Sequence, residues 1–186
     1  GYVDGLFLSS GISNNIDDTM EKTIETTRLL RKEYGYQDYI HLKIIPGASK
    51  DSIKRAMSLA DRVSINIEAA TKSGLDEISS TKDYNKDILK RIDWINEIKR
   101  KNPSYIKSGH TTQLIIGAND ETDLEVLKRV DELYKKVNLQ TSYFSPFTPI
   151  EGTDLEGHDA CSSRRTAQLY HANALVNDYH FKMDEM

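Results

Sequence analysis

The amino-acid sequence predicts an α/β protein, an incomplete (β/α) barrel of about five parallel βα units that is similar to part of a TIM barrel. Short strand-like segments alternate with helical segments along the whole chain, and this order indicates parallel strands joined by crossovers. An open doubly wound sheet also fits the order, but its central strands are usually apolar on both faces, and these strands are not. A complete eight-unit barrel needs about 250 residues, so a chain of 186 residues has room only for an arc.

The predicted strands are short, β-branched and apolar, and most of them end in glycine, proline or polar residues. In chain order they are Gly5–Ser10, Ile40–Ile45, Arg62–Glu68, Thr112–Gly117 and Thr141–Phe147. The helical segments between them carry apolar stripes at spacings of three or four residues. These stripes are Met20, Ile24, Thr27 and Leu30; Ile53, Met57 and Ala60; Ile88, Ile92 and Ile95; and Leu124, Leu127, Val130 and Tyr134.

Start signals support two of the predicted helices. Ser49 precedes "KDSIKRAM", and Asn119-Asp120 precede "ETDLEVL". Both are good N-cap residues followed by acidic residues in the first helical turn, where the helix dipole favours them. The segment 69–87 is the one long excursion from the alternation.

The end of the chain reads as a polar loop followed by a helix. The loop covers 151–160, and the helix covers roughly 162–179. We expect this helix to pack on the barrel through Ala167, Tyr170, Ala174 and Leu175. The predicted division is therefore a partial barrel core over 1–160 and a C-terminal helical segment over 161–186.

Composition excludes several classes of protein. The net charge of -4 and the pI of about 5.8 give no overall electrostatic footprint for nucleic acid. No apolar run approaches the ~20 residues of a membrane span, and no signal-peptide pattern opens the chain. A single cysteine, Cys161, excludes an internal disulfide and indicates a reducing compartment, so we expect a cytoplasmic protein. It also excludes a zinc or iron–sulfur site ligated by cysteines of this chain alone.

The start of the chain suggests a fragment. The first residue is Gly1, and the core-like strand "GLFLSSG" begins within five residues of it. We therefore expect a piece of a larger protein, and a processed or tag-derived Gly1 is the alternative.

Several strands place polar side chains on one face near their carboxyl ends, where ligand sites of βα proteins form. In "SINIE", Ser64, Asn66 and Glu68 alternate with isoleucines. A carboxylate inside a barrel is costly unless it is paired or binds a ligand. Glu68 is thus expected either to form an ion pair with Lys43 or to bind hydroxyl or amine groups of a polar ligand. Lys43 is also a candidate for Schiff-base chemistry.

Other polar residues have simpler interpretations. His41 lies deeper in its strand, and we expect a core histidine with its hydrogen bonds satisfied. Ser9 and Ser10 are either turn formers or ligand contacts, and Cys161 is expected to be incidental. Arg164 and Arg165 are expected to be a solvated helix terminus. The remaining histidines show no metal-ligand spacing.

These strand ends resemble the radical S-adenosylmethionine (SAM) superfamily, whose fold is an open (β/α) barrel. The stretches "GLFLSSGI", "YIHLKIIPGA", "ADRVSINIEA", "TTQLIIGANDETD" and "LYHANALVNDYHF" carry the likeness. They are similar, more narrowly, to a subgroup named for DNA modification or repair. The resemblance runs over nearly the whole chain, and it implies a SAM-binding protein.

The resemblance also implies roles for individual residues. Backbone at Ser9-Ser10-Gly11 would bind the methionyl amine of SAM, and Lys43 is a candidate for its carboxylate. Asn66 and Glu68 would lie near the ribose and methionyl group, and backbone near Phe147 would meet the adenine. The superfamily pattern Gly-x-Ile-x-Gly-x-x-Glu here reads Gln113, Ile115, Gly117 and Asp120, so two positions depart from it and Ile115 would pack on the adenine.

The superfamily's chemistry also needs three cysteines spaced CxxxCxxC, which hold a [4Fe–4S] cluster that cleaves SAM to a 5′-deoxyadenosyl radical. Such cysteines are not in this sequence. We therefore expect an inactive, weakly SAM-binding fragment of such an enzyme. The alternatives are a (β/α)-barrel lyase or isomerase using Lys43 or Glu68, and a non-catalytic interaction module. Nucleic acid is implied as a partner only by the subgroup's name, and an open sheet edge is expected to favour a homodimer.

Overall fold

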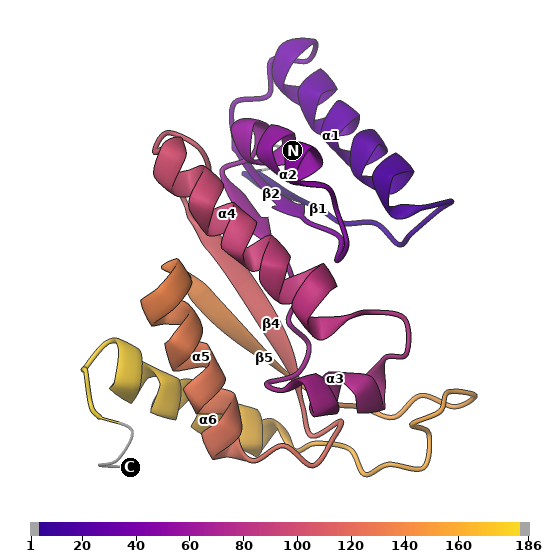
Figure 1. The fold of residues 1–186 in the computed structure, drawn as a ribbon, viewed down its shortest axis with the longest axis vertical. Coiled ribbons are helices and arrows are strands. Elements are labelled where there is room, and N and C mark those ends of the chain that lie inside the picture. The colour runs from indigo at the N-terminus through magenta and orange to yellow at the C-terminus, as the bar shows by residue number, and fades with distance from the viewer. Residues whose placement is uncertain (1–3, 183–186) are drawn as a thin grey trace. The chain divides into compact units, whose positions relative to one another are not determined.

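The computed structural model describes residues 4–182, and the chain divides into two compact units. Unit 1 contains the described residues up to Asn66 together with Asn85–Thr112, and unit 2 contains Ile67–Tyr84 together with the described residues from Gln113 onward. In chain order the elements are β1 (Gly5–Leu8), α1 (Ile16–Lys32), β2 (Tyr39–Lys43), α2 (Lys50–Leu59), β3 (Arg62–Ser64), α3 (Lys72–Ile78), the π-helix η1 (Tyr84–Leu89), α4 (Lys90–Lys101), β4 (His110–Ile116), α5 (Asp123–Val137), β5 (Thr141–Pro146) and α6 (Ser163–Asn177) (Figure 1). No composition shift in the sequence marks the division into units.

The five strands follow one another in the order β1-β2-β3-β4-β5, and the register shows parallel pairing from β1 to the start of β4. Each crossover contains at least one helix, as the alternation predicted. The first four residues of the β2 ladder pair with β1, from Gly5 opposite Tyr39 to Leu8 opposite Leu42. This order brings the carboxyl ends of neighbouring strands to the same edge of each unit's sheet.

The core of unit 1 lies between its strands and the helices α1, α2 and α4. Ile40 and Leu42 of β2 are fully buried, as are Ile53 and Met57 of α2. Met20 of α1 is equally buried, so the predicted apolar stripes of these helices are confirmed. Figure 1 shows α1 and α2 side by side in this unit.

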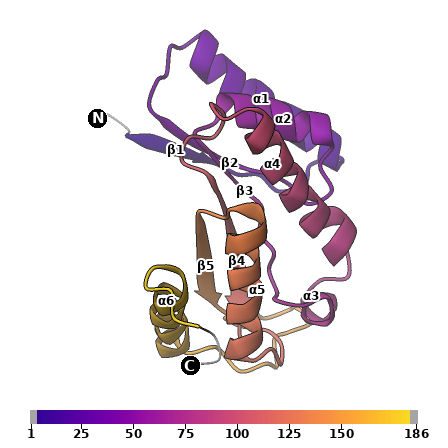
Figure 2. The ribbon, with the colours of Figure 1, turned by 60° about the vertical axis from the view of Figure 1, so that its left-hand side comes forward.

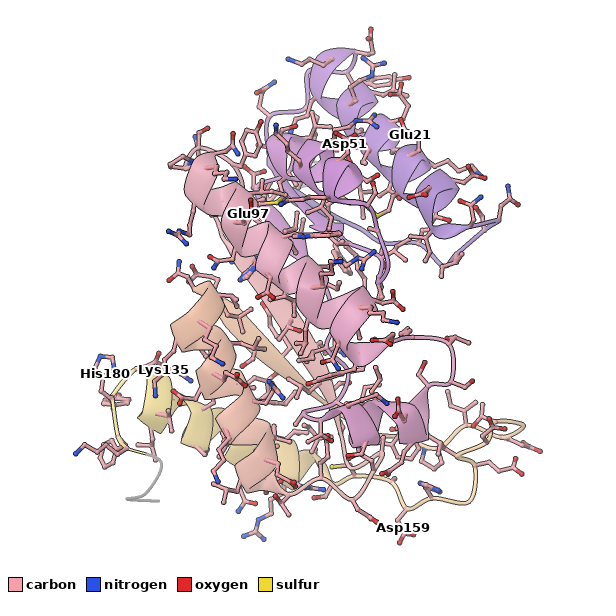
Figure 3. All side chains as sticks on the ribbon, viewed as in Figure 1. Glu21, Asp51, Glu97, Lys135, Asp159 and His180 are labelled. Carbon is pink, nitrogen blue, oxygen red and sulfur yellow. The ribbon has the colours of Figure 1, made fainter. Side chains whose placement is uncertain are left out.

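Exposed ion pairs tie the outer helices of unit 1 together. Arg55 of α2 contacts Glu21 of α1 at 2.6 Å, and Lys50 of α2 pairs with Glu97 of α4. Figure 3 labels both carboxylates. Because these pairs are solvated, they add little to stability and mainly set side-chain positions.

The predicted strand Arg62–Glu68 is wrong in its length, because β3 ends at Ser64. The Thr112 hydroxyl donates a 2.8 Å hydrogen bond to the Ile65 carbonyl, which replaces a ladder partner. Pairing resumes as one isolated bridge between Glu68 and Leu114. The stretch "SINIE" is therefore extended chain with one polar corner rather than a regular strand.

Unit 2 contains α5 and α6, and α6 packs on both α5 and β5 (Figure 2). The predicted packing face of α6 is wrong: Tyr170 and Leu175 are about two-fifths exposed, and the buried residues are Thr166, Leu169 and Val176. The side-chain pattern of this helix is too weakly amphipathic to fix its orientation, so contacts with its neighbours set it.

The start of α5 also differs from the prediction. The N-cap is Thr122, and it forms a capping box with Glu125. Asn119-Asp120 instead belong to the loop before the helix. The 69–87 excursion contains α3 and the first turn of η1, which carry no long apolar stripe. Within residues 4–182, no helix has the length and apolarity to cross a membrane.

Candidate functional site

The turn after β1 in unit 1 leaves its backbone open. Ser9, Ser10 and Gly11 are all exposed, and the Ser10 hydroxyl donates a 2.7 Å hydrogen bond to the Gly11 carbonyl. A side chain built at Gly11 would meet nothing within 4 Å. There is therefore room for a ligand beside this turn, which the predicted role of the three residues requires.

Lys43 is the last residue of β2 and lies at the same strand end. Leu8 of β1 is aligned with Leu42 of β2. Ser9 and Lys43 are the next residues of the two segments, so they leave the β1–β2 ladder at the same end. Lys43 is itself aligned with Ser64 of β3 and is partly buried. Asn66 follows two residues later and is only 9% exposed. Unit 1 therefore gathers its predicted site residues at the carboxyl ends of neighbouring strands.

His41 does not match the expected satisfied core histidine. Its Nε2 atom is buried and has no hydrogen-bond partner among the described residues. Burial, followed by the positive charges of Arg62 and Lys43, lowers the pKa of His41 to about 4. His41 is therefore neutral at pH 7 and sits beside two cations.

Glu68 is the most unusual backbone position among the predicted site residues of unit 2. Its φ is 65°, in the left-handed region that residues with a side chain rarely adopt. The Ala69 N–H donates a 2.8 Å hydrogen bond to the Ile67 carbonyl across it, which makes a γ-turn of the strained, positive-φ form. Such a backbone costs about 1–3 kcal/mol and persists only where its surroundings hold it.

Two hydrogen bonds and one ion pair hold Glu68 in place. Its N–H donates to the Gln113 carbonyl at 3.0 Å, and its carbonyl accepts from the Ile115 N–H at 2.8 Å. Its carboxylate lies 3.5 Å from the Lys82 ammonium, and the Glu68 side chain is 14% exposed. The expected alternative partner was Lys43, but the ion pair that the structure gives Glu68 is with Lys82.

Residues at the end of β4 alternate between partly exposed and buried positions. Gln113, Ile115 and Gly117 are partly exposed, whereas Leu114 and Ile116 between them are buried. This alternation is the period of two that a strand imposes. Ile115 therefore offers an accessible apolar surface directly beside Glu68.

Gly117 ends this strand with a φ of 84°, and it is packed against Cys161. A Cβ at Gly117 would lie 2.8 Å from the Cys161 Cβ, so no larger residue fits without a shift. Cys161 therefore fills the space over this glycine, and the expectation that it is incidental to function stays a prediction.

Phe147 lies just after β5, and its backbone is hydrogen-bonded to Ile116 and Cys161. Its N–H donates to the Ile116 carbonyl at 2.9 Å, and its carbonyl accepts from the Cys161 N–H at 2.9 Å. The Phe147 ring makes an edge contact with His158, with centroids 6.4 Å apart. One lone pair of the Phe147 carbonyl is left for a ligand.

Sequence reasoning missed Glu121, which holds the turn after Glu68. Its carboxylate accepts hydrogen bonds from the Ala70 N–H at 2.8 Å, the Thr71 N–H at 2.6 Å and the Thr71 hydroxyl at 2.7 Å. Asp120, the predicted acidic position of the pattern, is exposed. The capping box at Thr122 was the available signal, because it places Glu121 in the loop ahead of the helix.

Two further side chains hold the same turn. The buried Tyr84 hydroxyl donates to the Ala70 carbonyl at 2.7 Å, and Arg129 Nε donates to the same oxygen at 2.8 Å. Burial raises the pKa of Tyr84, so this hydroxyl keeps its proton. We call Glu121, Tyr84 and Arg129 the turn clamp.

Arg165 of α6 contacts Glu121 of the turn clamp and the neighbouring Asp123. Its Nε contacts Asp123 Oδ1 at 2.7 Å, and its terminal nitrogen donates to the Glu121 carbonyl at 2.9 Å. The expectation of a solvated arginine is therefore wrong for Arg165. A chain of contacts thus connects α6 to the γ-turn at Glu68.

Within the described residues, no group of three or more histidine, cysteine or acidic side chains is placed to hold a metal ion. The polar strand ends described above are instead suited to hydrogen bonding with a small polar molecule.

No family model matches this sequence, and no curated protein matches it significantly. A solved structure does match: a domain of pyruvate-formate lyase-activating enzyme from Bacteroides vulgatus ATCC 8482. The TM-score is 0.60 at 9% sequence identity, and the match covers 97% of each chain. The predicted fold class, an incomplete (β/α) barrel of parallel strands, is thereby confirmed. At this identity the likeness establishes the fold alone.

Proposed function

We propose that this chain is the SAM-binding part of a radical SAM enzyme. The observation that carries the proposal is the fold likeness over 97% of both chains to a domain of an activating enzyme, a class that belongs to the radical SAM superfamily. The polar strand ends predicted from the sequence support it independently. The comparisons lend no support to the narrower DNA modification subgroup, and nucleic acid as a partner stays a prediction.

In this proposal unit 2 binds the adenosine part of SAM. The Glu68 carboxylate accepts hydrogen bonds from the ribose hydroxyls, and its strained backbone aims it. Ile115 provides an apolar surface for the adenine ring. The remaining lone pair of the Phe147 carbonyl accepts from the exocyclic amine of adenine.

The contacts with the methionyl part of SAM that the resemblance implies fall on residues of unit 1, and each is a prediction for that unit by itself. The exposed backbone of Ser9, Ser10 and Gly11 has room to receive the amine, and Asn66 adds an amide at the end of the neighbouring strand. The resemblance also makes Lys43 a candidate for the carboxylate, and this role excludes the binding of a second anion by Lys43 at the same time. These roles rest on the resemblance and on the open geometry of the turn.

The residues of this chain do not fit an iron–sulfur cluster. A cluster of this kind is held by several thiolates, and the sequence contains Cys161 alone. Cys161 also packs over Gly117. We therefore derive no step through a cluster, and we expect this chain by itself to leave SAM uncleaved.

The test is SAM binding by matched carboxylate variants. A hydrogen bond to a charged group contributes about 1.5–3 kcal/mol, so Glu68→Gln should weaken SAM binding by about tenfold or more. Glu77→Gln changes an exposed carboxylate of α3 in the same unit and should leave affinity unchanged. Equal SAM affinity for both variants would remove Glu68 from the site.

A further inference from the structure

One face of the unit 1 sheet gathers aromatic and basic side chains. Phe7 is aligned with His41, and His41 is aligned with Arg62. Residues paired in a parallel ladder point to the same side, as do residues two apart in one strand. Tyr39 and Lys43 therefore share the face with His41, and we call these five residues the basic face.

The basic face carries two cations and no acidic residue. Ser64 and Thr111 occupy the next aligned positions, and both are neutral. Burial lowers the pKa of His41 most, and the positive charges of Arg62 and Lys43 lower it further, so both cations lie near this histidine. The aligned strand positions of this face therefore carry two positive charges and no negative one at pH 7, in a protein whose net charge is -4.

Two buried polar atoms on this face have no partner within the described residues. They are His41 Nε2 and Thr111 Oγ1, and Thr111 is only 2% exposed. A buried polar group without a hydrogen bond costs about 1–3 kcal/mol. Such groups are normally satisfied by water, an ion or a ligand.

An exposed aromatic ring lies next to these groups. The Phe7 side chain is 59% exposed, although it sits on a sheet rather than in a loop. Its ring centroid is 4.6 Å from that of His41. An exposed phenylalanine beside cations fits a ligand that joins a flat ring to a negative charge.

We propose that the basic face binds a small aromatic anion, a carboxylate or phosphate carried on a flat ring. The ring stacks on Phe7, and Lys43 and Arg62 neutralise the anionic group. As the substrate class of the proposed radical enzyme, this assignment rests on the proposed function. The binding itself does not require SAM.

Binding can be followed through the ring signals of His41 in ¹H–¹³C NMR spectra, assigned with His41→Gln. The probes are phenyl phosphate and benzoate, with benzyl alcohol as the neutral ring and inorganic phosphate as the anion without a ring. We expect one of the two aromatic anions to shift the His41 signals to saturation and to bind at least tenfold more tightly than benzyl alcohol or inorganic phosphate. If it is phenyl phosphate the site prefers a phosphate group, and if it is benzoate the site prefers a carboxylate. Equal binding of benzyl alcohol, or no saturable change, would overturn the proposal.

Matched variants place the site. Lys43→Gln and Arg62→Lys each change one cation of the basic face. Arg62→Lys keeps the positive charge, because the hydrogen bond from Arg62 to the Ser108 carbonyl also supports the fold. Lys43→Gln should weaken the bound aromatic anion about fivefold or more, and Arg62→Lys should weaken it less. Lys54→Gln, on the exposed side of α2, should have no effect. An equal loss with Lys54→Gln would mean nonspecific charge attraction and would contradict the site.

The same samples separate this inference from the proposed function. SAM binding without aromatic-anion binding would overturn the basic face and leave the function standing. Aromatic-anion binding without SAM binding would support the basic face as a binding site and overturn the proposed function. If SAM displaces the aromatic anion and Lys43→Gln weakens both equally, the face binds the carboxylate of SAM, and the substrate assignment is wrong.

Discussion

Glu68 combines a left-handed backbone with a partly buried carboxylate, and these two features can be tested apart. Glycine adopts a φ of 65° without the steric cost that alanine meets. We expect Glu68→Gly to be about 1 kcal/mol more stable than Glu68→Ala in urea unfolding. Both variants lack the carboxylate and should lose SAM affinity alike. An alanine variant as stable as the glycine variant would argue against a strained turn.

Glu121 is the residue on which the turn clamp depends. Replacing it with glutamine puts an amide against three donors, so at least one hydrogen bond to a charged acceptor is lost. We expect Glu121→Gln to lower the free energy of unfolding by about 1.5–3 kcal/mol. Asp120→Asn, one position away and exposed, should change it by less than about 0.5 kcal/mol. The reverse order of the two variants would mean that Glu121 does not hold the turn.

Two histidines give the protein a defined sensitivity to acid. Burial lowers the pKa of both His41 and His110 to about 4, and for His41 nearby cations contribute. The unfolded chain takes up protons near the ordinary value of about 6.5, before the folded chain does. Stability is therefore complete above that value and falls as the pH drops towards 4, by at most about 1.4 kcal/mol per pH unit for each histidine.

Urea unfolding between pH 7 and pH 5 measures this loss before most carboxylates titrate. His41→Gln should reduce the slope of stability against pH, whatever it does to stability at pH 7. His171→Gln, an exposed residue of α6, is the control and should keep the slope. A wild-type protein whose stability rises towards pH 5 would contradict the assignment.

At the scale of elements, a side chain of α6 forms a hydrogen bond with the backbone of β5. The Phe144 N–H donates to the Tyr170 hydroxyl at 2.9 Å, and the two rings meet edge to face at 5.0 Å. Tyr170→Phe keeps the ring and removes the acceptor, and it should cost about 1 kcal/mol. Amide exchange at Phe144 should also accelerate. Tyr143→Phe, exposed on the same strand, is the control, and equal effects of the two changes would assign no special role to Tyr170.

The sequence predicted the elements that have strong periodicity. The stripes through Met20, Ile53 and Ile92 are buried as expected, because these helices each bury one continuous face. The helix α3 was missed because Leu75 is its one fully buried large side chain, and a helix this short shows no stripe. The face of α6 was misjudged because Tyr170 serves as a hydrogen-bond partner for β5 rather than as a core residue.

Contacts between distant residues could not be predicted. Glu121 and Ala70 are 51 positions apart, and the hydrogen bond between them depends on how β4 and its loop are folded. Glu68 was singled out because a carboxylate in an apolar strand is visible in the sequence. Its left-handed backbone was not visible, since no glycine or asparagine marks the position.

For the whole molecule, the fold was predictable because the alternation of strands and helices has few packing solutions. The proposed function depends on a ligand, and its central claim is that the chain binds SAM. Saturation-transfer NMR with SAM tests it most directly, because the method detects weak binding. We predict saturation of the adenine and ribose protons, displaced by S-adenosylhomocysteine and diminished in Glu68→Gln but not in Glu77→Gln. A folded chain that gives no saturable signal at millimolar SAM would contradict the account.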